Sequence, residues 1–98
     1  MRKVGFLPAA QAELLHEVNY YSKARTGYGV RFNAAVKAAT ARAASSPEGG
    51  APAPGETRKY RVKGFPLNVV YRASENEILV VALAPDSKRP EYWLPRTQ

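Results

Sequence analysis

The stretch TRKYRVKGFPLNVVYRASENEILVVALA, at residues 57–84, decides the fold because it holds three strand-like runs in close succession. Residues 57–62 alternate between polar and apolar side chains, residues 67–73 form a second β-rich run, and residues 78–84 are almost wholly apolar. A Gly-Phe-Pro turn separates the first two runs, and the polar residues 74–77 supply a hairpin turn for the last. The apolar character of the third run predicts a central strand that is covered on both faces.

The first predicted helix lies upstream of these strands. A short apolar segment at residues 4–7 indicates a strand that stops at Pro8, and proline suits the first turn of a helix. From about residue 9 to residue 24 the apolar side chains follow helical spacing. This spacing predicts an apolar face with Leu14, Val18 and Tyr21, with Leu15 beside them. The predicted polar face holds Gln11, Glu13, Glu17 and Lys23.

A second helix is predicted from about residue 28 to residue 45, where apolar residues recur at steps of three and four and many alanines raise helix propensity. The short connection between the helices predicts an antiparallel hairpin. Residues 47–55, PEGGAPAPG, are typical of a connecting loop, because prolines and glycines exclude a helix or a central strand. The predicted order β-α-α-β-β-β describes one α+β domain over residues 1–98, with the helical hairpin packed on one face of a small antiparallel sheet.

Composition and charge limit the class of protein. The chain has 98 residues, of which 45% are hydrophobic, so it has room for one domain with a modest core. It has no cysteine and no stretch typical of a signal peptide or a membrane span, so we expect a cytoplasmic protein with no membrane contact. The net charge of +7, from 15 Lys and Arg against 8 Asp and Glu, predicts an acidic partner: nucleic acid, a nucleic-acid enzyme or an acidic protein. A basic but merely solvated surface is the alternative.

Conventional catalytic and cofactor motifs are missing from the sequence. His16 is the single histidine and lies within the first helix, where no Ser/His/Asp arrangement forms around it. One histidine, no cysteine and scattered carboxylates do not make a metal site, and no glycine-rich phosphate loop is present. We therefore expect no catalytic residues of an ordinary hydrolase, no metal and no cofactor.

One basic cluster lies on the predicted strands. Arg61 and Lys63 share a face because they are two residues apart, with Lys59 alongside, and Arg72 lies on the neighbouring strand. These residues predict a supporting basic face for an acidic partner. The alternative is a solvated face of the sheet.

A second cluster lies in the last segment of the chain, where Lys88, Arg89 and Arg96 flank Tyr92 and Trp93. Cations interleaved with aromatic rings bind phosphates and stack on bases, or they form a hot spot against another protein. This segment is therefore the predicted target-binding site. The alternative is that Tyr92 and Trp93 close the core as the tail folds back.

The sequence as a whole resembles the ParE/RelE superfamily of toxins from bacterial type II toxin–antitoxin systems. The resemblance covers nearly the whole chain in order. It rests on FLPAAQAEL at 6–14, Tyr20-Tyr21, Arg31-Phe32, Pro47, Arg58, FPLNVVYR at 65–72 and KRPEYWLPR at 88–96.

The resemblance implies a toxin that inhibits growth and that a cognate antitoxin, a small protein with an acidic segment, holds inactive. ParE-type members poison DNA gyrase without catalysis, and their tail is implicated. RelE-type members cleave mRNA on the ribosome with basic residues on the sheet and a tail tyrosine. We expect the ParE-type function, with the ribosome-dependent endonuclease as the alternative.

Two departures from the superfamily pattern bear on this choice. Asn68 stands three residues before Tyr71, where the ribonuclease branch commonly has an arginine, and losing a cation that stabilises charge at the phosphate disfavours RNA cleavage. Pro85 stands where ParE-like sequences often have a histidine, and Lys88 where arginine is frequent. Any role of that histidine is absent here, so a third reading is an inactive toxin fold that still binds an antitoxin.

Overall fold

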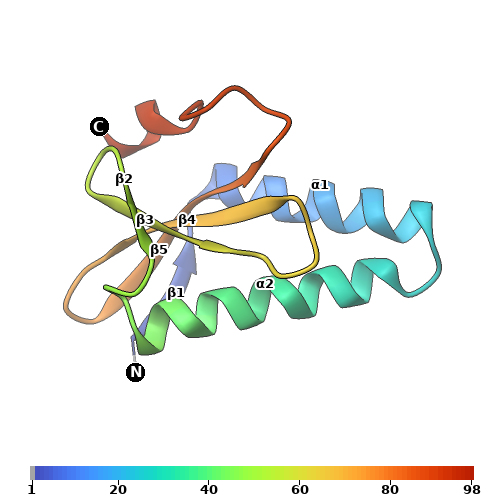
Figure 1. The fold of residues 1–98 in the computed structure, drawn as a ribbon, viewed down its shortest axis with the longest axis horizontal. Coiled ribbons are helices and arrows are strands. Elements are labelled where there is room, and N and C mark those ends of the chain that lie inside the picture. Colours follow the sequence, from blue (N-terminus) through green and yellow to red (C-terminus); the bar gives the residue numbers. More distant parts are fainter. Residues whose placement is uncertain (1) are drawn as a thin grey trace.

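The computed structural model describes residues 2–98, which form one α+β domain (Figure 1). A strand and two helices precede four strands and a short 3₁₀ helix, so the predicted fold class and helical hairpin are confirmed. The elements are β1 (Lys3–Phe6), α1 (Pro8–Ala24), α2 (Tyr28–Ser45), β2 (Ala51–Ala53), β3 (Thr57–Arg61), β4 (Leu67–Ala73), β5 (Glu77–Pro85) and η1 (Leu94–Thr97).

The five strands form one sheet in the order β1-β5-β4-β3-β2. The three predicted strands of residues 57–84 pair in antiparallel fashion, but β1 pairs in parallel with β5, so the sheet is mixed and not wholly antiparallel. The predicted connecting loop also contributes β2, which pairs with β3 at the far edge. Pro52 is tolerated in β2 because a proline at a sheet edge leaves no ladder hydrogen bond unmade.

An irregularity in β5 explains why this strand is apolar along nearly its whole length. Val70 pairs with Ala82 and Tyr71 pairs with Val80, so Val81 is an extra residue that shifts the register. Val81 and Ala82 therefore both pack on the face away from the helices, while Val80 belongs to the core under the helices. The prediction that this strand is covered on both faces is confirmed.

The helical hairpin covers one face of the sheet. Gly29 lets the two helices approach closely, because a Cβ at this position would collide with the Ser22 hydroxyl of α1. Tyr21, Tyr28, Phe32 and Phe65 form a cluster of aromatic rings between the helices and the β3–β4 turn. Tyr21 and Phe65 are thus packing residues, and Tyr21 belongs to the apolar helix face expected from the sequence.

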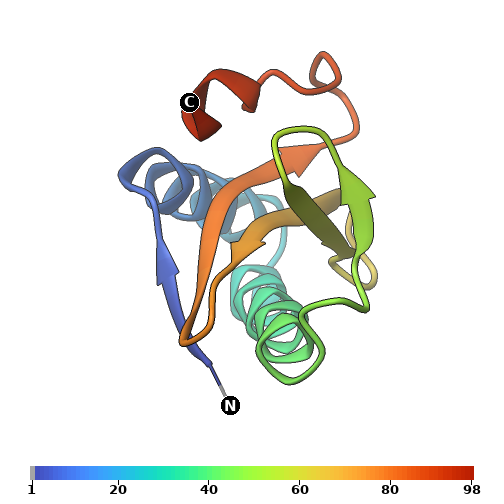
Figure 2. The ribbon, with the colours of Figure 1, turned by 90° about the vertical axis from the view of Figure 1, so that its left-hand side faces the viewer.

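The C-terminal tail, which we define as residues 86–98, lies over the opposite face of the sheet (Figures 1 and 2). The sheet is thereby enclosed between the helices and the tail. Within residues 2–98, no helix has the length and apolar character needed to cross a membrane.

Candidate functional site: a cationic groove under the tail

Trp93 anchors the tail to the sheet. Its side chain is only 4% exposed and packs with Val70, Val81 and Ala82. The bulge in β5 makes this possible, because it turns two consecutive small apolar residues toward the indole ring. Of the two roles weighed for Trp93 from the sequence, the structure shows the closing of the core, and the residue also lines the groove described below.

Glu13 of α1 holds the rest of the tail in place. Its carboxylate accepts two hydrogen bonds from the Arg96 guanidinium at 3.0 and 3.1 Å and one from the Tyr92 hydroxyl at 2.6 Å. It also accepts the backbone N–H of Leu83 at 3.1 Å, and Arg96 donates to the Val81 carbonyl at 3.1 Å. These bonds make Glu13 the residue through which α1, β5 and the tail are joined.

The helical spacing predicted that Glu13 lies on the polar, solvent-facing side of its helix, and this prediction is wrong. Glu13 stands three residues after the fully buried Ala10, on the side of α1 that meets β5 and the tail. The one signal of this contact in the sequence is that Glu13 follows Ala10 by three residues, because residues three apart lie on the same side of a helix. It could not be read as a polar contact because the partner lies at the other end of the chain.

The protonation of this cluster follows from its geometry. Burial raises the pKa of Glu13, but the hydrogen bonds from Arg96, Tyr92 and Leu83 outweigh burial, and the pKa is lowered from its usual value. Burial and the bond to the Glu13 carboxylate raise the pKa of Tyr92 well above that of a free phenol. Glu13 is therefore a stable carboxylate, and Tyr92 is a neutral hydrogen-bond donor.

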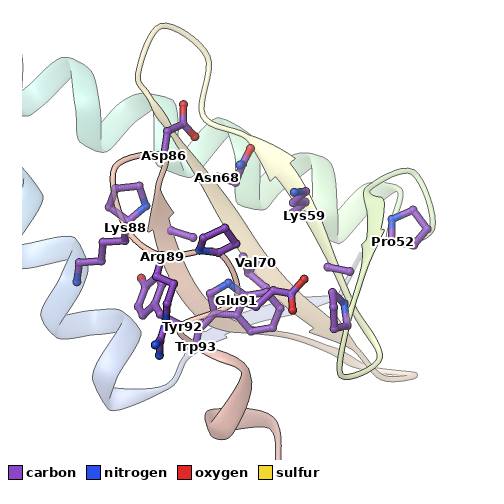
Figure 3. A pocket seen from close by; sticks show the side chains of 15 residues that line it. Pro52, Lys59, Asn68, Val70, Asp86, Lys88, Arg89, Glu91, Tyr92 and Trp93 are labelled. Atoms are coloured by element: carbon purple, nitrogen blue, oxygen red, sulfur yellow. The ribbon is translucent and has the colours of Figure 1, made fainter.

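Between the tail and the sheet lies a groove of about 390 Å³, which we call the tail groove (Figure 3). Lys59 and Asn68 line it from β3 and β4, and Lys88 and Arg89 line it from the tail. Four prolines stand on its walls, which limits the backbone freedom of the rim. They are Pro52, Pro54, Pro85 and Pro90.

Lys88 and Arg89 are the cations that the tail presents to solvent. Both are exposed, and neither takes part in an ion pair within residues 2–98. The Lys88 ammonium lies 4.8 Å from the centre of the Tyr92 ring, a cation–π contact that holds it beside this ring. Glu91 adopts a left-handed backbone conformation, with φ at 60°, as the chain turns back from these cations toward Trp93.

The predicted basic face on the strands is only partly available. Arg61 forms a two-point ion pair with Asp86 at 2.9 and 2.8 Å, which lowers the pKa of the Asp86 carboxyl. Arg72 is half-buried and donates to the carbonyls of Gly55 and Thr97. Lys63 is exposed in the turn after β3. Within residues 2–98 the structure shows no hydrogen bond or ion pair for its side chain, unlike those of Arg61 and Arg72.

The structure thus divides the residues predicted for the site. Lys88 and Arg89 are presented at the groove, Lys63 is exposed beyond it, and Lys59 joins them from β3. The others make contacts within the fold, and two of them, Tyr92 and Trp93, also line the groove: Arg61, Arg72, Tyr92, Trp93 and Arg96.

The acid–base groups on the groove wall are Asp86, Glu91 and Tyr92, beside the cations. His16 is exposed on α1 and is not among the groove-lining residues. Among residues 2–98, no group of three or more His, Cys, Asp and Glu side chains could hold a metal ion. The groove offers three cations, Lys59, Lys88 and Arg89, and two carboxylates, Asp86 and Glu91, beside an amide and rigid apolar walls.

Comparison with known proteins gives a similarity of fold. No protein-family model matches this sequence, and no curated protein matches it. A solved chain described as "Chromosomal ParDE TA system from P. aeruginosa" has a TM-score of 0.69 and 15% sequence identity, and the match covers 87% of this chain and 96% of that chain. The two chains therefore share a fold over most of their lengths.

Proposed function

We propose that this protein is the toxin of a type II toxin–antitoxin pair and that a small protein with an acidic segment neutralises it. The fold shared with a chain of a ParDE system supports this proposal, because the shared architecture extends over most of both chains. The net charge of +7 supports an acidic partner.

We further propose that the toxin inhibits DNA gyrase by binding and not by catalysis. The observation that carries this proposal is the state of Tyr92, whose hydroxyl donates to the Glu13 carboxylate at 2.6 Å. A general base must be able to give up its own proton near the working pH, and the raised pKa of Tyr92 opposes this. The neighbouring cations, Lys88 and Arg89, are suited to contact an anionic surface.

The rigidity of the tail supports recognition by a preformed surface. Trp93 and the Glu13 cluster fix the chain after the segment that bears Lys88 and Arg89, and the Arg61–Asp86 pair holds the chain before it. Pro90 restricts the turn that follows Arg89. A segment that is already ordered loses less conformational entropy on binding. The tail groove is therefore our candidate for the surface that contacts gyrase or its DNA.

Two assays on the purified protein test this function. We expect inhibition of gyrase-catalysed supercoiling, loss of that inhibition in Arg89→Glu, and normal translation of an mRNA in a reconstituted system. Codon-specific cuts in the mRNA with normal supercoiling would support the ribosome-dependent endonuclease instead, in which Lys59 and its neighbours bind the phosphate. No effect in either assay, together with tight binding of an antitoxin, would support the inactive module.

The neutralising partner has a test of its own. We expect the adjacent reading frame to encode a small protein with an acidic segment that forms a complex with this chain and suppresses its effect on growth. A chain that is stable alone and has no effect on bacterial growth would count strongly against the proposed function.

A further inference from the structure

The end of the domain at which α1 turns into α2 is rich in exposed cations. Figure 1 shows this turn at one end of the long axis, and the β3–β4 turn extends toward the same end. The two segments that meet there, residues 18–47 and 57–74, contain no Asp or Glu. Arg25, Arg31 and Lys63 are exposed, and none of their side chains has a hydrogen bond or an ion pair within residues 2–98. We define the cationic tip by these three residues and Tyr28.

Aromatic rings hold the cations of the tip in place. The guanidinium carbons of Arg25 and Arg31 lie 6.0 and 5.9 Å from the centre of the Tyr28 ring, so they are no farther apart than the sum of these distances. The centre of the Tyr28 ring lies 5.2 Å from that of Phe65 in the turn after β3. A backbone hydrogen bond of 3.1 Å closes this turn, which also bears Lys63. The contact between the two rings therefore brings the three cations to one place.

Two carboxylates border the tip, and both are directed elsewhere. The backbone N–H of Asp86 donates to the carbonyl of Pro66 at 2.9 Å, but both carboxylate oxygens of Asp86 are bound by Arg61. Glu17 is half-buried on α1 and lines a hollow on the tail side of this helix together with Lys88. The positive charge of the tip is therefore left for a partner.

The tip is suited to phosphates more than to a protein surface. A protein hot spot needs an apolar anchor among its cations, but the Tyr28 ring is half-buried between Phe65 and the two arginines. Val30 is the exposed aliphatic residue of this turn of α2, and it lies about 200° around the helix from Tyr28. Arginine guanidinium groups, by contrast, match phosphate oxygens in geometry and charge.

A duplex fits the tip better than a single strand. Proteins that bind single strands stack the bases on open aromatic rings, and the Tyr28 ring is already occupied by its neighbours. Tyr20 is the exposed ring nearby, but it lines a separate hollow beside Glu17. A duplex keeps its bases stacked inside and presents its phosphates, which is what three fixed cations can contact.

We propose that the cationic tip binds the phosphate backbone of duplex DNA. The choice of DNA rests on the proposed function, since gyrase acts on duplex DNA, whereas the contact with phosphates does not depend on it. The tip shares no residue with the lining of the tail groove, so the chain can hold DNA at the tip while the groove contacts gyrase. Because phosphates carry no sequence information, duplexes of different sequence should bind alike.

Fluorescence anisotropy of a short labelled DNA duplex, titrated with the whole chain at several salt concentrations, tests the proposal. For three phosphate contacts, the logarithm of the association constant should fall with that of the salt concentration with a slope of about −2.7. Arg31→Glu and Lys63→Glu should each bind about tenfold more weakly and reduce the size of this slope by about one. Neither change breaks an ion pair within residues 2–98, so the thermal midpoints should stay near that of wild type.

Lys3→Glu is the matched control, because it reverses an exposed charge on β1, toward the other end of the domain (Figure 1). It should bind the duplex as wild type does. Equal losses in Lys3→Glu and Arg31→Glu would mean that net charge alone attracts DNA, and the tip would be overturned. Tighter binding of polyglutamate than of the duplex would overturn it in favour of an acidic protein, and tighter binding of an RNA duplex would overturn it in favour of RNA.

The gyrase assay keeps this inference distinct from the proposed function. Loss of DNA binding in Arg31→Glu, combined with normal supercoiling in the presence of wild type, would support the tip and reject gyrase as the target. Inhibition of supercoiling by a wild-type chain that does not bind the duplex at low salt would support the proposed function and overturn the tip.

Discussion

Arg96 in the C-terminal tail forms a two-point ion pair with Glu13 in α1, with Nη1–Oε1 at 3.0 Å and Nη2–Oε2 at 3.1 Å. The two side chains are 24% and 15% exposed, so water screens the pair only in part. The pair is bidentate and shares its carboxylate with Tyr92, which gives the tail a defined orientation on the sheet. Four predictions for the tail follow from this attachment and from Trp93, and a fifth concerns the cations that the tail presents.

Replacing Glu13 by glutamine should weaken the attachment of the tail. The amide cannot accept both N–H groups of Arg96 and leaves that guanidinium without its counter-ion. We expect a loss of about 1–3 kcal/mol in the free energy of unfolding, which urea titration followed by Trp93 fluorescence would measure. Glu17→Gln, one turn along the same helix, is the control and should change this value by less than about 0.5 kcal/mol. Equal unfolding midpoints for Glu13→Gln and wild type would contradict the role given to Glu13.

Acid should release the tail before it unfolds the domain. The folded pKa of Glu13 lies below its usual value of 4.5, so its contribution to stability is fully present above that value and is lost as the pH falls through the folded pKa. We expect the emission of Trp93, the single tryptophan, to shift to longer wavelength below about pH 4.5 while the helical circular dichroism persists.

Asp86 titrates in the same direction, because Arg61 lowers the pKa of its carboxyl as well. Glu13→Gln separates the two contributions, since only the Glu13 transition disappears in this variant. A wild-type emission that stays constant until the helices melt would contradict a separate release of the tail.

Local patterns in the sequence predicted the helices and most of the strands. The features that they did not predict come from contacts between residues that are far apart in the chain. The helices and the strands of residues 57–84 follow from periodicity, which each segment shows by itself. The parallel pairing of β1 with β5 depends on which sheet edge is free. The register shift at Val81 turns Val81 and Ala82 toward Trp93, a residue of the distant tail. Neither relation is visible within one segment.

The residues predicted for the candidate site differ in the same way, because some of them contact residues that are distant in the sequence. Lys88 and Arg89 were singled out because the last segment interleaves cations with aromatic rings, and the structure shows that both are exposed. Arg96 and Tyr92 looked equivalent to them in the sequence, but both contact Glu13, whose distance along the chain from Arg96 is 83 residues. A cation that binds a target and one that fastens a tail have the same side chain, and only the fold distinguishes them.

Removing the indole ring should destabilise the domain itself. Trp93 is buried against Val70, Val81 and Ala82, so Trp93→Ala leaves a cavity over the sheet. We expect a loss of about 3–5 kcal/mol, measured by circular dichroism during thermal unfolding. Trp93→Phe fills part of the space and should lose less. Near wild-type stability of Trp93→Ala would mean that the tail does not close the core in solution.

Tyr92→Phe should keep most of the toxicity. The substitution removes the hydrogen bond to Glu13, which costs about 1 kcal/mol of stability, but the ring still contacts Lys88 and Arg96. Growth inhibition by the variant and by wild type at equal protein level is the measurement. Codon-specific mRNA cuts that are present with wild type and vanish with Tyr92→Phe would show that the hydroxyl acts in catalysis.

Charge reversal at Arg89 should abolish growth inhibition and leave the fold intact. Arg89 lines the tail groove and is exposed. It has no ion pair within residues 2–98, so replacing it breaks none. A glutamate there repels an anionic target instead of attracting it, and we expect at least a tenfold loss of inhibition in the supercoiling assay. The thermal midpoint and the affinity for the antitoxin should stay near those of wild type. Arg61→Glu is the informative comparison, because it also reverses a charge but breaks the pair with Asp86. Full toxicity of Arg89→Glu combined with loss of toxicity in Arg61→Glu would move the target site from the tail to strand β3, and the tail would then be a structural cap.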